Sequence, residues 1–310
     1  MDMFFMNKKF SGVYIPMCTP FSDDGEQVNE PELRALCRFL IRKGVHGLFP
    51  IGTTGECAFL TVEERKRIAE IVVDETNGAI PVIIHSGAVT TRETVALTRH
   101  AQSIGADGAA MVVPYYYSLD DGEIFDHYDQ VLQEVPGFPT LAYNIPGNAK
   151  NYLKPSVVEA LRVKHSHLVG VKNSISSLTD FQQFVALGNG DFFPFIGNDR
   201  LILPALVIGA CGSVSSNALI FPELFAQLYE SYWAGQLEKA LETQKKITKF
   251  VSFSETGRSF AKYKAALRLR GIQCGGMRQP LRPLSDEDET QCLQYTQQLA
   301  QEFNIELESQ

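Results

Sequence analysis

Short runs of consecutive apolar residues alternate along the chain with longer stretches in which apolar residues recur every three or four positions. A continuous apolar run is typical of a strand that is buried on both faces, and a period of about 3.6 residues is typical of an amphipathic helix. The apolar runs predict strands over residues 13–17, 47–51, 81–85, 109–114, 140–144, 168–172, 193–197 and 212–215.

Amphipathic stretches follow these runs and predict helices. Two helix starts, at Thr61 and Thr90, have a glutamate three residues later, which is the spacing of a capping box. Eight repeats of a strand and a helix favour a (β/α)8 barrel, and the absence of GxGxxG after the first strand argues against a doubly wound open sheet. Besides the helix after Thr90, the predicted helices span residues 30–43, 62–75, 124–134, 155–162, 178–187, 200–208 and 221–233.

Beyond Ala234 the pattern becomes helical throughout, and we predict no further strand. Helices are expected over residues 237–253, 260–269 and 285–303, with a break at the prolines of residues 280–283. We therefore expect a barrel domain over residues 1–234 that contains the active site, followed by a C-terminal helical extension over residues 235–310 that packs on the barrel.

Composition narrows the classes of protein to consider. The chain has 310 residues, of which 45% are hydrophobic, so it can bury a sizeable core. Its net charge is -8 and it has no Lys/Arg-rich block, which argues against a nucleic-acid or anionic-membrane partner. The start of the chain lacks a signal-peptide pattern, and no segment is apolar enough to span a membrane. Six cysteines without CxxC pairs or zinc spacing predict reduced thiols in a cytoplasmic protein.

The apolar run over residues 168–172 ends at Lys172, an unusual position for a hydrated side chain. Desolvation at the end of a buried strand disfavours the charged ammonium group, and a neutral amine is a nucleophile toward carbonyl carbons. A snorkelling or ion-paired lysine is the ordinary alternative, and this strand taken alone favours it. The residues at the ends of the neighbouring strands therefore distinguish a reactive Lys172 from a snorkelling or ion-paired one.

In a barrel, chemistry takes place at the carboxyl ends of the strands. Gly52, Thr53 and Thr54 follow the second strand in a GTTGE sequence that could hold a carboxylate, although a tight turn with a helix cap is the alternative. Tyr143 lies at the carboxyl end of the fifth strand, where a phenol could transfer protons. With Lys172, these residues predict Schiff-base chemistry on a 2-oxo acid, which makes or breaks a carbon–carbon bond. We expect no metal and no other cofactor.

The chain resembles the dihydrodipicolinate synthase and N-acetylneuraminate lyase superfamily of pyruvate-dependent class I lyases and aldolases. The resemblance runs from Gly12 to the C-terminal helices. Its motifs are GTTGE at residues 52–56, PYY at residues 114–116, YNIP at residues 143–146 and GVK at residues 170–172. It implies a (β/α)8 barrel with a helical C-terminal extension, commonly assembled as a tetramer of two dimers.

The resemblance also implies roles for single residues. Lys172 matches the lysine that forms the Schiff base, and Tyr143 matches the catalytic tyrosine. Thr53 and Thr54 match the pair that holds the pyruvate carboxylate, and Thr53 also belongs to the proton relay of the synthases. Tyr116 matches the relay tyrosine that reaches in from a neighbouring subunit in that subfamily.

Asn148 departs from the synthase pattern, which has an arginine at this position for the carboxylate of the aldehyde partner. An asparagine offers no bidentate cationic fork, and Lys150 could replace only part of the charge. The neuraminate lyases have GSTGE instead of GTTGE. The sequence therefore favours an aldolase or dehydratase for 2-keto-3-deoxy sugar acids or hydroxy-oxo acids. Further residues expected to line the site are Asn198, Asp199, Ser213, Val214, Ser174, Ser177, Ser215 and His85, and a helix cap is the alternative role of Asn198.

Three other interpretations stay open. The first is a 4-hydroxy-tetrahydrodipicolinate synthase, which condenses pyruvate with aspartate semialdehyde. The second is a metal-dependent aldolase on the same fold, which the lack of clustered His, Asp and Glu at the strand ends disfavours. The third is a barrel that binds 2-oxo acids without catalysis.

Overall fold

The computed structural model describes residues 8–188, 190–254 and 259–308, and within these ranges eight strands belong to one sheet in the order β2-β1-β8-β7-β6-β5-β4-β3. In this order, each strand from β1 to β3 is paired in parallel with the next strand. The predicted (β/α)8 class is confirmed. The strands are β1 Gly12–Ile15, β2 Gly47–Leu48, β3 Ile83–His85, β4 Gly108–Val112, β5 Thr140–Asn144, β6 Leu168–Asn173, β7 Phe193–Ile196 and β8 Gly212–Val214.

Most helices lie close to their predicted positions. One that the sequence analysis missed, α5, is a single four-residue turn that begins at a proline, too short to produce a periodic pattern. The α-helices are α1 Glu30–Arg42, α2 Val62–Thr76, α3 Thr91–Ser103, α4 Asp121–Gln133, α5 Pro146–Ala149, α6 Pro155–Lys164, α7 Leu178–Val185, α8 Ile202–Val207, α9 Pro222–Trp233, α10 Leu237–Ser254, α11 Ser259–Leu267 and α12 Asp286–Phe303. Short 3-10 turns include η2 Cys57–Phe59 and η3 Asp199–Leu201.

Several predicted boundaries differ from the structure by one to three residues, and two of the larger differences have a clear physical reason. The strand predicted over residues 47–51 ends at Leu48, because Ile51 has a φ of 62° and the chain turns there. The helix predicted over residues 124–134 begins at Asp121, because Asp120 forms a capping box with Glu123. The capping box predicted at Thr61 is present and starts α2.

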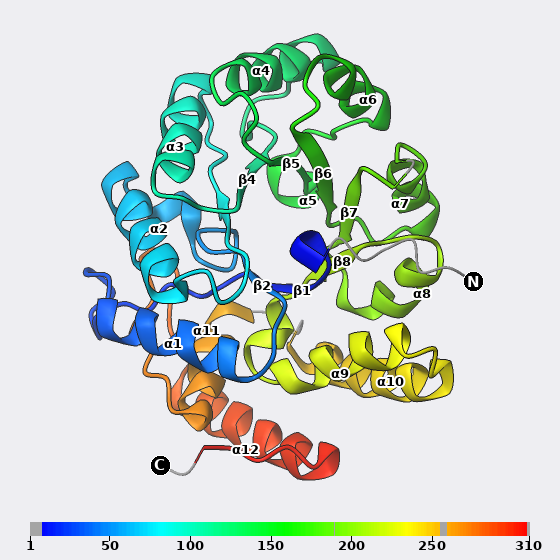
Figure 1. Ribbon diagram of the computed structural model, residues 1–310. Helices are drawn as coiled ribbons and strands as arrows, with labels where there is room; N and C mark the ends of the chain where they lie inside the picture. The colour runs from blue at the N-terminus through cyan, green and yellow to red at the C-terminus, as the bar shows by residue number, and fades with distance from the viewer. Residues whose placement is uncertain (1–7, 189, 255–258, 309–310) are drawn as a thin grey trace. The chain divides into compact units, whose positions relative to one another are not determined.

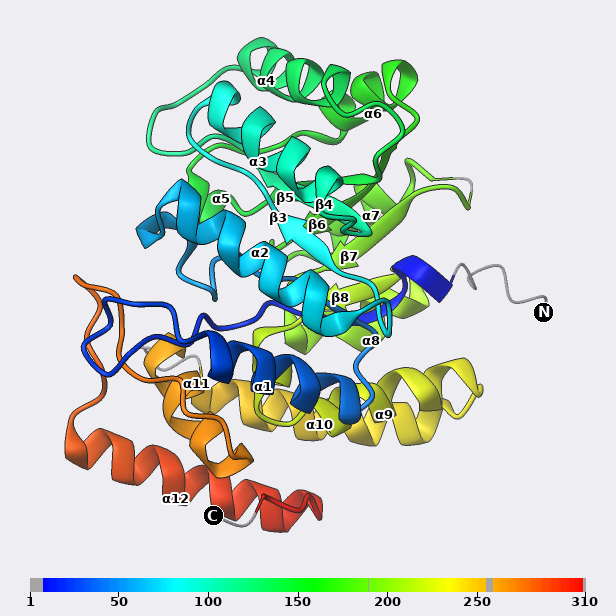
Figure 2. The same cartoon turned by 60° about the vertical axis from the view of Figure 1, so that its left-hand side comes forward.

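The described residues divide into two compact units, and the first consists of residues up to Tyr14 together with residues 81–214. It contains β3 to β8, and helices α3, α4 and α6 lie outside strands β4 to β6 (Figure 1). Helices α3 and α4 pack side by side (Figure 2). Tyr128 of α4 is fully buried in the core of this unit and donates a hydrogen bond to the carbonyl of Met111 in β4 at 2.7 Å.

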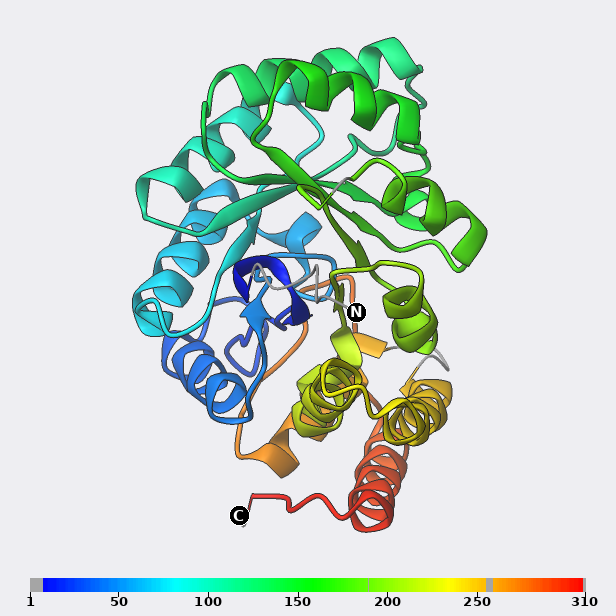
Figure 3. The same cartoon turned by 45° about the vertical axis from the view of Figure 1, so that its right-hand side comes forward.

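The second unit consists of residues 15–80 and the residues from Ser215 onward. Helices α9 and α10 pack side by side (Figure 3), and α11 packs on α12. Within the described ranges, every helix falls short of the length and apolar character needed to cross a bilayer. The predicted division after residue 234 does not coincide with these two units, and it stays a prediction.

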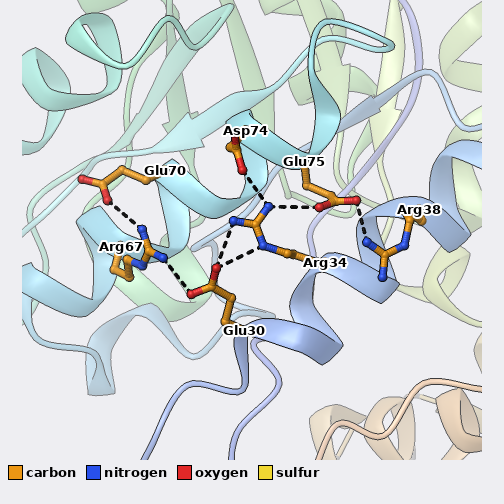
Figure 4. A network of polar contacts seen from close by, with 7 residues as sticks. All are labelled: Glu30, Arg34, Arg38, Arg67, Glu70, Asp74 and Glu75. Carbon is orange, nitrogen blue, oxygen red and sulfur yellow. Dashed lines mark hydrogen bonds and ion pairs between the residues drawn. The ribbon is translucent and has the colours of Figure 1, made fainter.

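Helices α1 and α2 of the second unit are joined by a network of charged side chains (Figure 4). Arg34 bonds to Glu30 at 2.9 Å, to Asp74 at 2.7 Å and to Glu75 at 3.0 Å. Arg67 extends the network through a second bond to Glu30 at 2.7 Å. Because several of these groups face solvent, water screens the attraction and each pair adds little to the stability of the unit.

A buried ion pair connects the end of the GTTGE sequence with α11. The carboxylate of Glu56 lies 2.7 Å from the ammonium group of Lys264, and the two side chains are 0% and 4% exposed. Lys264 also donates to the carbonyl of Gly276 at 2.8 Å, and the N–H of Arg278 donates to Glu56 at 3.1 Å. The turn after β2 is therefore held by residues from the C-terminal part of the chain.

The cysteines are free thiols, and all except Cys57 are buried. Burial raises the pKa of the Cys37, Cys211 and Cys274 thiols to about 12. A buried thiol that stays protonated at neutral pH is a poor nucleophile, so these side chains fill the core.

We predict that Lys264→Met lowers the free energy of unfolding by about 3–5 kcal/mol, because it leaves the Glu56 carboxylate charged and buried without its cation. Urea denaturation of the purified protein measures the change. Lys249→Met is the matched control, since its pair with Glu302 is nearly half exposed and contributes less than about 1 kcal/mol. Equal losses in the two variants would contradict the prediction.

Candidate functional site

Lys172 and Tyr143 lie together at the carboxyl ends of two neighbouring strands. Strands β5 and β6 are paired with Tyr143 opposite Lys172. The amine nitrogen of Lys172 lies 4.0 Å from the centroid of the Tyr143 ring, where the aromatic face attracts a cation. Lys172 is 4% exposed and Tyr143 is 2% exposed, so the snorkelling alternative is excluded for this lysine. The structure thus brings together the two side chains for which the sequence predicts imine formation and proton transfer.

The glycine of the GVK sequence has a steric role beside this lysine. A Cβ atom on Gly170 would lie 2.4 Å from the carbonyl oxygen of Phe193 in the neighbouring strand β7. Any side chain at this position would push β6 away from β7. Gly170 therefore allows the close strand packing that carries Lys172 to the end of β6.

His85, at the end of β3, contacts Tyr143 from a different strand. The two rings meet edge to face, with centroids 5.8 Å apart, and His85 is buried. This geometry is the favourable one for a pair of aromatic rings. The expectation that His85 lies near the site is consistent with this contact, whereas a chemical role for His85 stays a prediction.

The GTTGE sequence forms a tight turn whose backbone bonds are partly internal. The N–H groups of residues 55–57 donate to the carbonyls of Gly52 and Thr53 at 3.0–3.3 Å. The hydroxyl of Thr54 lies 2.7 Å from the hydroxyl of Ser216, a contact that the sequence did not indicate. The N–H groups of residues 55–57 are thus engaged within the turn. Carboxylate binding by Thr53 and Thr54 stays a prediction.

The loop after β4 presents two tyrosines to solvent. Tyr116 is 76% exposed and has a φ of 82°, and its ring packs edge to face against Tyr117. Asn151, which the sequence analysis missed, holds this loop: its amide donates to the carbonyls of Pro114 and Tyr117 at 2.8 Å and accepts from the N–H of Leu119 at 3.0 Å. The exposure of Tyr116 leaves room for a role that involves a second subunit, and that role stays a prediction.

The loop after β5 contains α5, which carries Asn148. Asn148 is exposed, and its backbone N–H donates to the carbonyl of Ile145 at 3.0 Å. Lys150 ends α5 with a φ of 65° and is also exposed. Both side chains have room to move, so whether they meet a substrate stays a prediction.

Four further candidates, Asn198, Asp199, Ser213 and Val214, lie at the ends of β7 and β8. Asn198 caps the 3-10 turn η3 by accepting from the N–H of Arg200 at 3.0 Å, so the helix-cap alternative is observed. Its amide also donates to the hydroxyl of Ser176 at 2.9 Å. The neighbouring candidates Asp199, Ser213 and Val214 are buried.

Buried asparagines directly follow both main candidates. Asn144 comes after Tyr143 and Asn173 comes after Lys172, and their side-chain amides are hydrogen-bonded to each other at 3.2 Å. This contact was not predicted, although the sequence has an asparagine directly after each of the two candidate residues. Over residues 8–188, 190–254 and 259–308, no group of three His, Cys, Asp or Glu side chains is arranged to hold a metal ion.

Comparison with known proteins gives consistent matches along the chain. A model of the dihydrodipicolinate synthetase family matches residues 9–299. A 4-hydroxy-tetrahydrodipicolinate synthase from Methanopyrus kandleri is 36% identical over 282 residues, which are 91% of this chain and 94% of that protein.

Two solved structures are similar over almost the whole chain. A sialic acid aldolase from Ruminococcus gnavus, solved as a catalytic lysine mutant, has a TM-score of 0.90 at 28% identity and covers 96% of this chain and 99% of its own. A prophage protein from E. coli K12, described as a member of the dihydrodipicolinic acid synthase family in complex with pyruvate, has a TM-score of 0.89 at 29% identity. That match covers 94% of this chain and 98% of its own.

We predict that Asn151→Ala destabilises the protein by about 2–4 kcal/mol, because it removes three hydrogen bonds from the loop after β4. Urea denaturation measures the loss, and faster chymotrypsin cleavage at Tyr116 and Tyr117 reports the loosened loop. Asn148→Ala is the control and should change stability by less than about 0.5 kcal/mol. Unchanged cleavage in Asn151→Ala would contradict the assignment.

Proposed function

Because the chain belongs to the dihydrodipicolinate synthetase family of pyruvate-dependent lyases that react through a lysine Schiff base, we propose that Lys172 is the lysine that forms the imine. The observation that carries this assignment is the burial of its amine 4.0 Å from the centroid of the Tyr143 ring. Burial keeps bulk water away from the amine, and Tyr143 supplies a hydroxyl group at the end of the neighbouring strand.

The proposed reaction begins when the Lys172 amine attacks the ketone carbon of a 2-oxo acid. A carbon–nitrogen bond forms, and the carbonyl oxygen takes up protons and leaves as water, with Tyr143 donating and accepting protons. The resulting iminium at C2 accepts the electron pair of the C3–C4 bond as that bond breaks. The hydroxyl on C4 loses its proton to Tyr143, the C4 fragment leaves as an aldehyde, and an enamine stays attached to Lys172. Protonation of the enamine and hydrolysis of the imine then release pyruvate and regenerate Lys172.

The carboxylate of the 2-oxo acid is proposed to bind at the turn after β2. Gly52 gives this turn its compact shape, and the hydroxyls of Thr53 and Thr54 are donors suited to a carboxylate. The hydrogen bond between Thr54 and Ser216 supports the proposal, because it limits the rotation of the Thr54 hydroxyl. Thr53 is also proposed to take part in proton transfer with Tyr116 of a second subunit.

The favoured substrates are 2-keto-3-deoxy sugar acids or related hydroxy-oxo acids. Asn148 supports this choice, because a neutral amide suits substrate hydroxyls better than a second carboxylate. We propose that Asn198, Asp199 and Ser213 contact these hydroxyls and that the backbone of Val214 lines the site. The second candidate is 4-hydroxy-tetrahydrodipicolinate synthase activity, which the name of the Methanopyrus kandleri relative favours.

Assembly and location are also proposals. The 76% exposure of Tyr116 supports a homotetramer in which this residue reaches a neighbouring subunit. Free thiols at all six cysteines support a reducing compartment such as the cytoplasm.

Borohydride reduction tests the imine. We expect the wild-type protein to gain the mass of a reduced pyruvate adduct on Lys172, and we expect Lys172→Ala to gain none. Peptide mass spectrometry locates the adduct. Pyruvate release from 2-keto-3-deoxy acids, with and without a chelator, then separates catalysis from binding alone and from a metal-dependent reaction. The absence of an adduct with any 2-oxo acid would exclude the proposed function.

Substitution of Asn148 tests substrate choice. We expect Asn148→Arg to raise kcat/KM for a carboxylate-bearing aldehyde relative to neutral aldehydes by about tenfold, because arginine offers a bidentate fork to the carboxylate. Asn148→Gln keeps the amide and serves as the control. Unchanged relative kcat/KM values across an aldehyde panel would place Asn148 outside the substrate site.

A further inference from the structure

The strands that carry Tyr143 and Lys172 present a second pair of residues on their opposite faces. Successive side chains of a strand point to opposite sides, so Asn144 and Asn173 point away from the side occupied by Tyr143 and Lys172. The pairing of β5 with β6 places Asn144 opposite Asn173, one step beyond the pair of Tyr143 and Lys172. Both asparagines are fully buried.

The two buried amides have hydrogen-bond partners that fix their orientation. The amide of Asn144 donates to the side-chain oxygen of Asn173 at 3.2 Å, and its own oxygen accepts from the N–H of Leu153 at 3.0 Å. The amide of Asn173 donates to the carboxylate of Asp180 at 3.1 Å, and its oxygen also accepts from the N–H of Ile175 at 3.3 Å. Because an N–H group must face the carboxylate, neither amide can flip without losing bonds.

Asp180 anchors this pair to the helix layer. It lies in the first turn of α7, where its N–H donates to the hydroxyl of Ser177 at 3.1 Å. Its second oxygen accepts from the hydroxyl of Tyr152 at 2.6 Å. Burial, together with the Asp180 carboxylate, raises the pKa of Tyr152, so this hydroxyl stays a donor. The amide pair is therefore held on both sides, by Asp180 and by the backbone at Leu153.

We propose that Asn144 and Asn173, held by Asp180, are positioning residues that keep the amine of Lys172 over the ring of Tyr143. The inference rests on the proposed function, because it assigns a purpose to the alignment of these two reactive side chains. If β5 slipped by one residue against β6, the side chains of β5 would point to the opposite face of the sheet relative to those of β6. Tyr143 would then no longer lie beside Lys172. The amides oppose such a slip, and smaller shifts, because their hydrogen bonds are directional.

An exchange of charge between residues 173 and 180 tests the proposal. Asn173→Asp places two carboxylates in contact, and we expect the rate of borohydride-trapped imine formation with pyruvate to fall by about 10–100-fold. Asp180→Asn keeps an acceptor for Asn173 and should cost less than about threefold. In the double variant Asn173→Asp/Asp180→Asn, the amide and carboxylate trade places and every hydrogen bond can form again. We expect its rate to return to within about fivefold of wild type.

Thr140→Val controls for a loss of stability alone. Its buried hydroxyl bonds to the carbonyl of Phe138 at 2.9 Å, at the opposite end of the same strand. We expect this variant to lose stability but to keep the wild-type rate of imine formation. The KM for pyruvate should change by less than about threefold in all variants, because the turn at Thr53 and Thr54 is untouched.

A second measurement needs no substrate. The pH profile of Lys172 acylation by acetic anhydride, followed on the Lys172 peptide by mass spectrometry, reports the surroundings of the amine. We expect the pH profile of Asn173→Asp to differ from that of the wild-type protein, and we expect the profile of the double variant to match the wild-type profile again. If wild type forms no imine, the proposed function fails, and the acylation profiles decide the positioning role on their own. Wild-type behaviour of Asn173→Asp, or a loss that the double variant does not restore, would overturn the inference.

Discussion

The pairing register of β5 and β6 is the constraint on which the candidate site depends. In this register, Tyr143 and Lys172 share one face, and Asn144 and Asn173 share the other. The side chains on the two faces differ in chemical character. On one face, Lys172, the residue proposed to form the imine, lies buried beside the ring of Tyr143. On the other face, each amide is hydrogen-bonded through both its nitrogen and its oxygen, which favours a single arrangement. The register thus couples the pair of side chains proposed to react with the substrate to a hydrogen-bonded pair of amides.

Similar support recurs around the other candidate residues. Asn151 holds the loop that carries Tyr116, and Ser216 contacts the hydroxyl of Thr54. Neither supporting residue lies in the loop that it holds. These two loops are thus held by a residue from another segment, a group that need never touch a substrate.

The sequence predicted the parts of the structure that local patterns determine. Residues 140–144 were predicted as a strand and form β5 without any change, because the run is apolar and prolines flank it on both sides. Lys172 and Tyr143 were found because strand ends carry chemistry in a barrel. The hydrogen bond between the side chains of Asn144 and Asn173 was not predicted. The other partners of these amides, Asp180 and Leu153, come from two other segments, so no local pattern indicates the contact. The turn at Ile51 escaped prediction because its positive φ leaves no trace in an apolar pattern.

The bond between Glu56 and Arg278 has a consequence for the order in which the chain can fold. The two residues are 222 positions apart, so a ribosome that adds about 5–20 residues per second needs on the order of 10–40 s to pass from one to the other. For most of that time the turn after β2 has been synthesised, but neither Arg278 nor the cation of Lys264 exists to hold it. The turn can take its final shape only after the C-terminal segment has left the ribosome, so a nascent chain cannot assemble this part of the site early.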